Sequence, residues 1–224
     1  MNLLDNPVWN ALHSVDKHFN KGTQKVSYFS EEVSPFVGLP DWSVKNQKIL
    51  ASLQLPARSW SAMIATPIYF SEEWEITFTT TLFQMVCRNL IPTEWVKNYR
   101  LLKKTDVSAM LTLTKMTKPG PFLKGTHLFG NYYGIFEDNL LVAMAGERLH
   151  LNGYTEISAV CTHPDFTGRG YAAFLVSRLA DEIIKKKEIP FLHVKNDNRR
   201  AIQMYERLGF EKRMDMYFSI FKKR

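Results

Sequence analysis

The sequence predicts an α/β fold in which a mixed, mostly antiparallel sheet is flanked by helices. Three strand-like segments follow one another closely in the second half of the chain: Tyr132–Phe136, Leu140–Leu149 and Tyr154–Thr162. The turns between them contain Asp138-Asn139 and Asn152-Gly153, and Asn-Gly is among the strongest signals for an antiparallel hairpin. After them helical and strand patterns alternate, which is typical of helices layered on a sheet.

The first 95 residues predict a smaller α/β segment. Asn6–Phe19 is expected to be helical, because Pro7 suits the first turn and apolar residues recur at helical spacing. The other elements expected are a helix at Val44–Leu55 and short strands at Val26–Phe29 and Ser61–Ala65. Ile76–Cys87 is rich in Thr, Phe and Val and predicts one long strand, with a helix over Thr81–Asn89 as the alternative.

A boundary is expected near Ile91–Thr93, so residues 1–95 and 96–224 are predicted as two domains. Beyond the boundary the patterns are cleaner. Besides the three hairpin strands, the expected elements are helices at Thr105–Met116, Tyr171–Lys186 and Asn198–Leu208 and strands at Phe191–Val194 and Tyr217–Phe221. Gly209 is expected to end the last helix.

Composition is that of a globular protein, with 45% hydrophobic and 23% charged residues in 224. Apolar runs do not approach the roughly 18 residues that span a bilayer, and the N-terminus lacks a secretory pattern. We therefore expect a cytoplasmic protein that does not bind membranes. Cys87 and Cys161 have no metal-ligand spacing, so we expect buried free thiols and no bound metal.

Charge is unevenly distributed along the chain. Residues 1–95 carry 7 Lys/Arg and 9 Asp/Glu, a net charge of −2, and residues 96–224 carry 22 and 13, a net charge of +9. A basic half suits a polyanionic ligand, either a phosphate-rich cofactor or a nucleic acid. Because no recognition-helix motif or stacking-aromatic pattern accompanies the charge, we do not expect specific nucleic-acid binding.

A glycine turn separates the strand that ends at Thr162 from the helix that begins at Tyr171. Gly168 and Gly170 leave backbone N–H groups open at a helix N-terminus, which is a cradle for phosphate. The spacing also fits a dinucleotide fingerprint, but the 27 residues after Asp197 are too few for the βαβ units which that fold needs. A P-loop is excluded because Lys-Ser/Thr does not follow the glycines.

Two motifs together resemble the GNAT superfamily of acyl-CoA-dependent N-acyltransferases. They are Gly168-Arg169-Gly170-Tyr171-Ala172, preceded by Thr162-x-Pro164, and Asn198-x-x-Ala201-x-x-x-Tyr205-x-x-x-Gly209-Phe210. The resemblance covers roughly Tyr99 to Lys223 and implies a GNAT-like fold. Gly153–Val160 is similar to the branch of glycine N-acyltransferase-like proteins, in which residues 1–95 would be a degenerate GNAT-like half.

The resemblance implies acetyl-CoA as co-substrate. The backbone N–H groups of Phe166–Ala172 would bind its pyrophosphate, and the edge of the strand near Val160 would pair with its pantetheine arm. The cofactor-binding residues implied are Val160, Cys161, Thr162, Phe166, Thr167, Gly168, Arg169, Gly170, Tyr171, Ala172 and Asn198. Asp165 stands where the family usually has Gln or Arg.

Amide formation from a thioester requires a neutral amine and a proton for the leaving thiolate. Glu156 is the candidate general base, acting through water, because a carboxylate in an apolar strand is costly unless it is used or paired. Strand alternation predicts that it shares a face with Ser158, Val160 and Thr162. Tyr205 matches the family's general acid, and the backbone N–H near Val160 is expected to polarise the thioester carbonyl.

The function expected is therefore transfer of an acetyl or other acyl group to a primary amine by direct attack. The acceptor is expected to be a small molecule or a peptide amine, and a homodimer is one option for the assembly. His193 is expected to serve packing or the surface. The alternative is a non-catalytic module that binds or senses acyl-CoA, which the departure at Asp165 favours.

Overall fold

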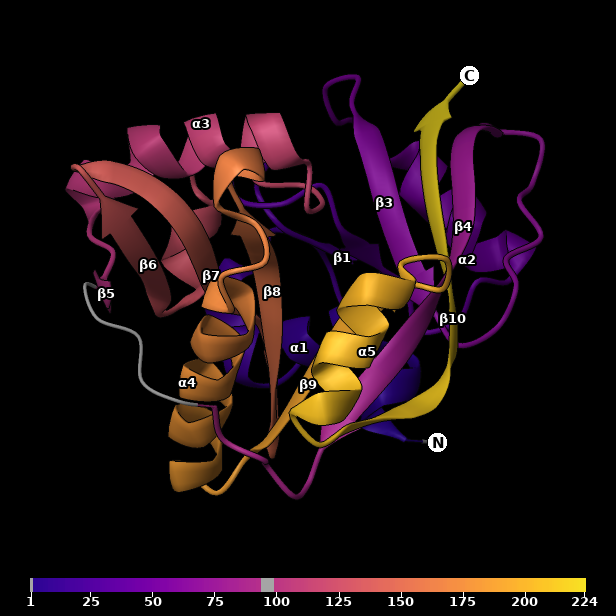
Figure 1. The fold of residues 1–224 in the computed structure, drawn as a ribbon. Helices are drawn as coiled ribbons and strands as arrows, with labels where there is room; N and C mark the ends of the chain where they lie inside the picture. The colour runs from indigo at the N-terminus through magenta and orange to yellow at the C-terminus, as the bar shows by residue number, and fades with distance from the viewer. Residues whose placement is uncertain (1, 94–98) are drawn as a thin grey trace.

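The computed structural model describes residues 2–93 and 99–224 (Figure 1). Its helices are α1 (Pro7–Leu12), α2 (Val44–Ser52), α3 (Val107–Thr117), α4 (Tyr171–Lys185) and α5 (Arg199–Arg207). Its strands are β1 (Ser27–Tyr28), β2 (Val37–Gly38), β3 (Ser59–Ile64), β4 (Trp74–Cys87), β5 (Tyr99–Leu101), β6 (Tyr132–Glu137), β7 (Leu140–Leu151), β8 (Tyr154–Thr162), β9 (Ile189–Lys195) and β10 (Phe210–Lys223). Short 3₁₀ helices cover Leu3–Asp5, Val15–Phe19, Lys104–Asp106, Thr126–Phe129 and Pro164–Phe166.

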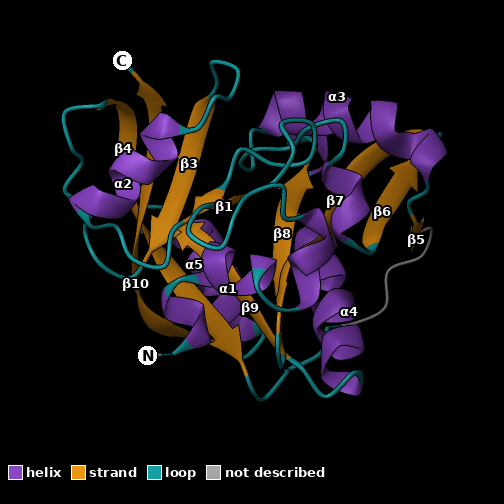
Figure 2. Ribbon diagram, turned by 180° about the vertical axis from the view of Figure 1, so that it is seen from behind, coloured by secondary structure: helices purple, strands orange, loops and turns teal. Residues whose placement is uncertain are grey.

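Eight of these strands form one sheet in the order β3-β10-β4-β9-β8-β7-β6-β5. The pairing of β8 with β9 is parallel and the other pairs are antiparallel, so the predicted mixed, mostly antiparallel sheet is confirmed. Helices α4 and α5 lie on one face, while α1 and α2 lie on the opposite face (Figures 1 and 2). None of the described helices is long and apolar enough to cross a membrane.

The N-terminal segment completes the sheet of the C-terminal one. Strand β4 lies between β9 and β10, and its pairing with β10 runs from Cys87↔Phe210 to Trp74↔Lys223. Strand β3 adds the edge beyond β10. The predicted division between residues 95 and 96 falls outside the described residues, and the strands on its two sides share one hydrogen-bonded sheet.

Two sequence expectations for the N-terminal segment have different outcomes. The single helix expected over Asn6–Phe19 is wrong, since α1 ends at Leu12 and a separate 3₁₀ helix follows at Val15–Phe19. That second turn is held by Asp16, whose carboxylate accepts hydrogen bonds from the backbone N–H and Nδ1 of His150 at 2.8 and 3.0 Å. The long strand is confirmed, and the alternative helix over Thr81–Asn89 is wrong because β4 pairs on both edges.

The helix predicted after the glycine turn is confirmed as α4, and one of its faces is an apolar stripe buried on the sheet. Leu175, Val176, Leu179 and Ile183 of α4 are fully buried against β7, β8 and β9. Burial of each such side chain contributes roughly 1.5–3 kcal/mol. This packing fixes α4 on the sheet, and with it the position of the glycine turn that precedes it.

Candidate functional site

Strands β8 and β9 diverge and open a pocket between them. Their parallel pairing covers only Tyr154↔Ile189, Thr155↔Pro190 and Glu156↔Phe191. Beyond Glu156, β9 continues to pair with β4 on its other edge, while β8 runs on to Thr162 beside β7. The divergence leads into a pocket of about 1080 Å³, bounded by β8, β9, the glycine turn, α5 and side chains of β4 and β10.

A β-bulge at Ala159 lies in the wall of this pocket. Ala159 has φ of 52°, and the register shifts there, so that Ser158 pairs with Gly146 but Cys161 pairs with Met144. The extra residue breaks the predicted alternation. Val160 packs with Ile157 against the α4 side of the sheet, so the expectation that Val160 shares a face with Glu156 is wrong. A bulge also leaves backbone groups unpaired, and here they are beside the pocket.

The glycine turn leaves the start of α4 without a side-chain cap. Gly168 and Gly170 have φ of 85° and 79°, and a Cβ at either position would meet nothing within 4 Å, so backbone conformation rather than space requires glycine. Gly170 is the N-cap residue of α4 and offers no side-chain acceptor to its N–H groups. The open N–H groups and the helix dipole therefore fit a phosphate.

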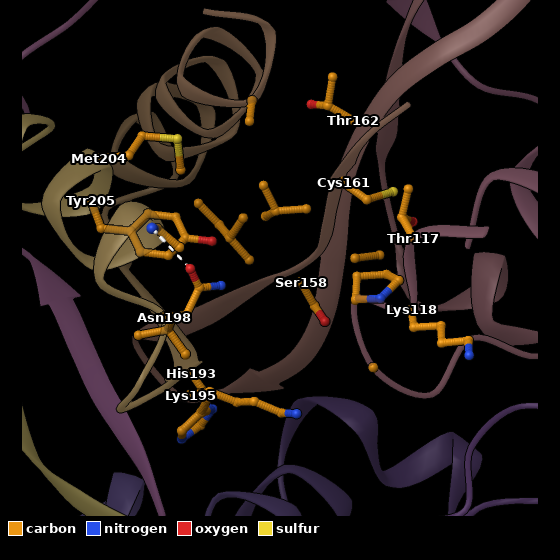
Figure 3. Close-up of a pocket in the computed structure, with 18 of the residues that line it drawn as sticks. Thr117, Lys118, Ser158, Cys161, Thr162, His193, Lys195, Asn198, Met204 and Tyr205 are labelled. Atoms are coloured by element: carbon orange, nitrogen blue, oxygen red, sulfur yellow. Dashed lines mark hydrogen bonds between the residues drawn. The ribbon is translucent and has the colours of Figure 1, made fainter. Parts of the chain in front are cut away.

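The pocket brings together nearly all of the residues expected to bind the cofactor. Those that line it are Val160, Cys161, Thr162, Phe166, Thr167, Gly168, Gly170, Tyr171, Ala172 and Asn198. Arg169 does not line it, because its guanidinium lies 4.6 Å from the centre of the Phe166 ring and is exposed. Asn198 caps α5 by accepting the N–H of Ala201 at 3.2 Å, which leaves its amide NH₂ free to donate (Figure 3).

Tyr205 reaches the pocket from α5, opposite Cys161 on β8 (Figure 3). Its ring is packed among core residues, and its hydroxyl has no hydrogen-bond partner among the described residues. Burial, and then the nearby Cys161, raise the pKa of Tyr205 above its usual value, so its hydroxyl stays protonated. Tyr205 therefore keeps a proton that it can share with a group bound in the pocket.

Both cysteines are buried free thiols, as expected. Cys161 is in the pocket wall, and burial raises its pKa to about 11. The cause is burial, which disfavours the charged thiolate in this part of the pocket wall.

Glu156 is on the expected strand, but its carboxylate does not reach the pocket. It is fully buried, and Arg148 donates to it from Nε at 2.8 Å and from Nη2 at 2.5 Å. His193 donates a further hydrogen bond from Nδ1 at 2.6 Å. Burial alone would raise the pKa of Glu156, but the charge and hydrogen bonds of Arg148, with His193, lower it to about 2. In this arrangement Glu156 is a weak base, and both of its oxygens are bound.

The contacts of Glu156 continue as a chain of buried polar groups across the sheet. The Gln84 amide donates to Nε2 of His193 at 2.9 Å, which leaves the His193 proton on Nδ1 toward Glu156. Arg213 donates to the oxygen of Gln84 at 2.6 Å and is paired with Asp5. Burial lowers the pKa of His193, so it is neutral, and it connects Gln84 to Glu156 at the edge of the pocket.

The described residues that line the pocket include cations but no Asp or Glu. The cationic residues are Lys118, Arg148, Lys195, Arg200 and Arg207. Sequence reasoning missed Arg148, although an arginine within the apolar run Leu140–Leu149 is as costly as Glu156 unless it is paired. The lining therefore favours an anionic ligand.

Three comparisons with known proteins agree with this geometry. Residues 132–219 match the family model described as FR47-like protein. A solved structure from Novosphingobium aromaticivorans, described as an acetyltransferase of the GNAT family, is 31% identical over the whole of both chains, with a TM-score of 0.93. An acetyltransferase of Yersinia enterocolitica is 47% identical over 51 residues, which is 22% of this chain and 36% of that protein.

More distant structures share the fold alone. A GCN5-related N-acetyltransferase from Kribbella flavida is 14% identical, with 96% of this chain and 92% of that one covered, at a TM-score of 0.59. The match to the curated Yersinia relative spans about a third of its length. The full-length similarity to the Novosphingobium protein is what establishes the family. This chain belongs to the GNAT family of acetyltransferases.

Proposed function

We propose that the protein transfers the acetyl group of acetyl-CoA to the nitrogen of a primary amine. The observation that carries this proposal is the pocket between the diverging strands β8 and β9, with the uncapped glycine turn in its wall. A pantetheine arm needs an extended slot with free backbone groups, and a pyrophosphate needs open N–H groups. The pocket offers both.

The residues of β8 and α4 fit acetyl-CoA in chemistry as well as in place. N–H groups from Phe166 to Ala172 would hold the pyrophosphate at the positive end of α4. The edge of β8 that β9 leaves unpaired would take the pantetheine arm, and the free amide NH₂ of Asn198 would donate to it. Arg169 is exposed beside the turn and would add charge attraction for phosphate.

In the transfer itself the amine nitrogen bonds to the acyl carbon and the thiolate leaves. The bulge at Ala159 supplies unpaired backbone, so the N–H near Val160 would stabilise the carbonyl oxygen. Tyr205 would donate its proton to the leaving sulfur. This donation matters because burial disfavours a charged thiolate, as the raised pKa of the Cys161 thiol in the same pocket wall indicates.

We propose that Glu156 acts by holding Arg148 and His193 in position, rather than by taking the amine proton itself. Its carboxylate is enclosed by both partners and has its pKa lowered to about 2. The cationic lining lowers the pKa of an amine bound nearby, so the neutral form that attacks is reached with water as the proton acceptor.

The second candidate function is a module that binds acyl-CoA without turning it over. The absence of Asp and Glu from the described pocket lining favours it, because an acetyltransferase commonly presents a carboxylate base to its acceptor. Membership of the glycine N-acyltransferase-like branch stays a prediction, which rests on the similarity of Gly153–Val160. That residues 1–95 form a degenerate GNAT-like half also stays a prediction.

Titration calorimetry of acetyl-CoA, followed by a free-thiol assay with pooled amines, separates the two functions. The transferase binds acetyl-CoA and releases thiol only when an amine is added. Binding with no amine-dependent thiol from any pool supports the module instead. Failure of acetyl-CoA to bind would overturn both.

A further inference from the structure

Three aromatic rings form a continuous row in the pocket wall. The Phe36 and Phe218 rings meet edge to face with centroids 6.1 Å apart, and Phe78 meets Phe218 at 6.3 Å. All three side chains line the pocket. Phe36 and Phe78 come from the N-terminal segment and Phe218 from β10, so this aromatic row is separate from the residues that fit acetyl-CoA.

A cation stands at each end of the aromatic row. The Arg148 guanidinium lies 5.1 Å from the centroid of Phe36, and the Lys195 ammonium lies 5.8 Å from that of Phe78. Both side chains line the pocket, and Lys195 has no carboxylate partner among the described residues. Figure 3 shows Lys195 below Asn198 and Tyr205, with its amine directed into the open space.

Arg148 keeps donors free although it is paired with Glu156. Nε and Nη2 carry the bonds to the carboxylate, while Nη1 donates to no group among the described residues. The side chain is 11% exposed, and that exposure is toward the pocket. The buried Glu156 thus holds a guanidinium in a fixed orientation, with its remaining N–H groups available to a ligand.

These contacts identify the acceptor, given the proposed function. We propose that it is an α-amino acid with an apolar side chain. Its carboxylate binds Lys195, and its side chain packs on the aromatic row. A simple alkylamine would bring a positive charge into a cationic lining and offer nothing to Lys195. Glycine would make the charge contact but would leave the aromatic row uncovered.

The reaction with such an acceptor is balanced. The neutral α-amino nitrogen forms the amide bond to the acetyl carbon as the carbon–sulfur bond breaks. The thiolate takes a proton from Tyr205, and the proton lost by the nitrogen passes to water and restores Tyr205. The products are the N-acetyl amino acid and free coenzyme A.

The test compares L-phenylalanine with phenethylamine, which differ only by the carboxylate. We expect kcat/KM to be at least about tenfold higher for L-phenylalanine, since a charge-assisted hydrogen bond contributes roughly that factor. Lys195→Gln should raise the KM for L-phenylalanine about fivefold or more and leave that for phenethylamine unchanged. Lys185→Gln removes the same charge from an exposed position on α4 that does not line the pocket, and it should change neither.

Calorimetry with the protein saturated with coenzyme A measures acceptor binding without turnover. Binding of L-phenylalanine that Lys195→Gln weakens, with phenethylamine weaker still, supports the inference. Equal binding or equal turnover of the two ligands, or binding that Lys195→Gln leaves unchanged, overturns it while acetyl transfer stands. Lys195-dependent binding with no thiol release under any amine supports the amino-acid site and overturns the transfer function.

Discussion

Replacement of Tyr205 by phenylalanine tests the proposed proton donor. The substitution removes one hydroxyl that has no hydrogen-bond partner among the described residues, and the ring keeps its packing at 5.9 Å from Phe210. We therefore expect the free energy of unfolding to change by less than about 1 kcal/mol. The affinity for acetyl-CoA should also be retained, because the fit to the glycine turn does not involve this hydroxyl.

Turnover should fall strongly in the same variant. General acid catalysis contributes about 10²–10⁴ in rate, and a hundredfold loss corresponds to about 2.7 kcal/mol. The rate loss is at the lower end of this range if a water molecule replaces the tyrosine hydroxyl as proton donor. Burial of the pocket wall, which raises the pKa of Cys161 to about 11, disfavours such a water. We expect kcat to drop at least about a hundredfold.

Stopped-flow detection of free thiol under saturating substrates measures this kcat. Tyr217→Phe, a tyrosine of β10 that does not line the pocket, is the matched control and should keep full activity. A Tyr205→Phe enzyme that turns over within about threefold of the wild type would remove Tyr205 from the mechanism.

Three further predictions concern the turn, the buried charges and pH. Gly170→Ala should weaken acetyl-CoA binding measured by calorimetry, because the φ of 79° is strained for any L side chain. The control is Gly153→Ala, where φ is 80° and the surroundings are equally open. Both variants should lose about 1 kcal/mol of stability, but Gly153→Ala should leave the affinity for acetyl-CoA unchanged. Arg148→Ala should destabilise the fold by about 3–5 kcal/mol in urea unfolding, because it leaves Glu156 charged and buried without its main partner, and a loss below 1 kcal/mol would contradict this pairing. His150 has its pKa raised to about 9 because its carboxylate partners outweigh burial. Because the pKa of His150 is raised on folding, its contribution to stability is complete below the unfolded value near 6.5 and is lost as the pH rises through 9. Unfolding followed from pH 6 to 10 should therefore show a loss of about 3 kcal/mol that His150→Gln lacks.

Local patterns in the sequence predicted the elements that position the site. Three of these patterns are local: the hairpin turn at Asn152-Gly153, the glycines before α4 and the apolar residues of α4. Each determines the structure of about one helix or turn, so it can be recognised in the sequence before the tertiary structure is known. The resemblance joined them to α5 and led to the pocket-lining residues Asn198 and Tyr205. Strands β2 and β5 were missed because two or three residues are too few to show a period.

The features of the site that differ from the sequence-based expectations come from pairing between strands of the sheet. The bulge at Ala159 leaves no trace in the alternation of β8, because it is created by the register with β7. The partner of Glu156 could have been found, since Arg148 lies almost as far before the turn at Asn152-Gly153 as Glu156 lies after it. The insertion of β4 between β9 and β10 brings Phe78 beside Phe218. The two residues are far apart in the sequence, so no local sequence pattern could predict their contact.

The most direct test of acetyl transfer is mass spectrometry of the products formed from acetyl-CoA labelled with ¹³C in the acetyl group. The protein is incubated with the labelled acetyl-CoA and a mixture of amines and amino acids, with Tyr205→Phe as the paired sample. We predict one class of N-acetylated product that carries the label, at a level that falls about a hundredfold in the variant. Binding of acetyl-CoA with no labelled amide from any amine would contradict the account and leave a protein that holds acyl-CoA without transferring its acyl group.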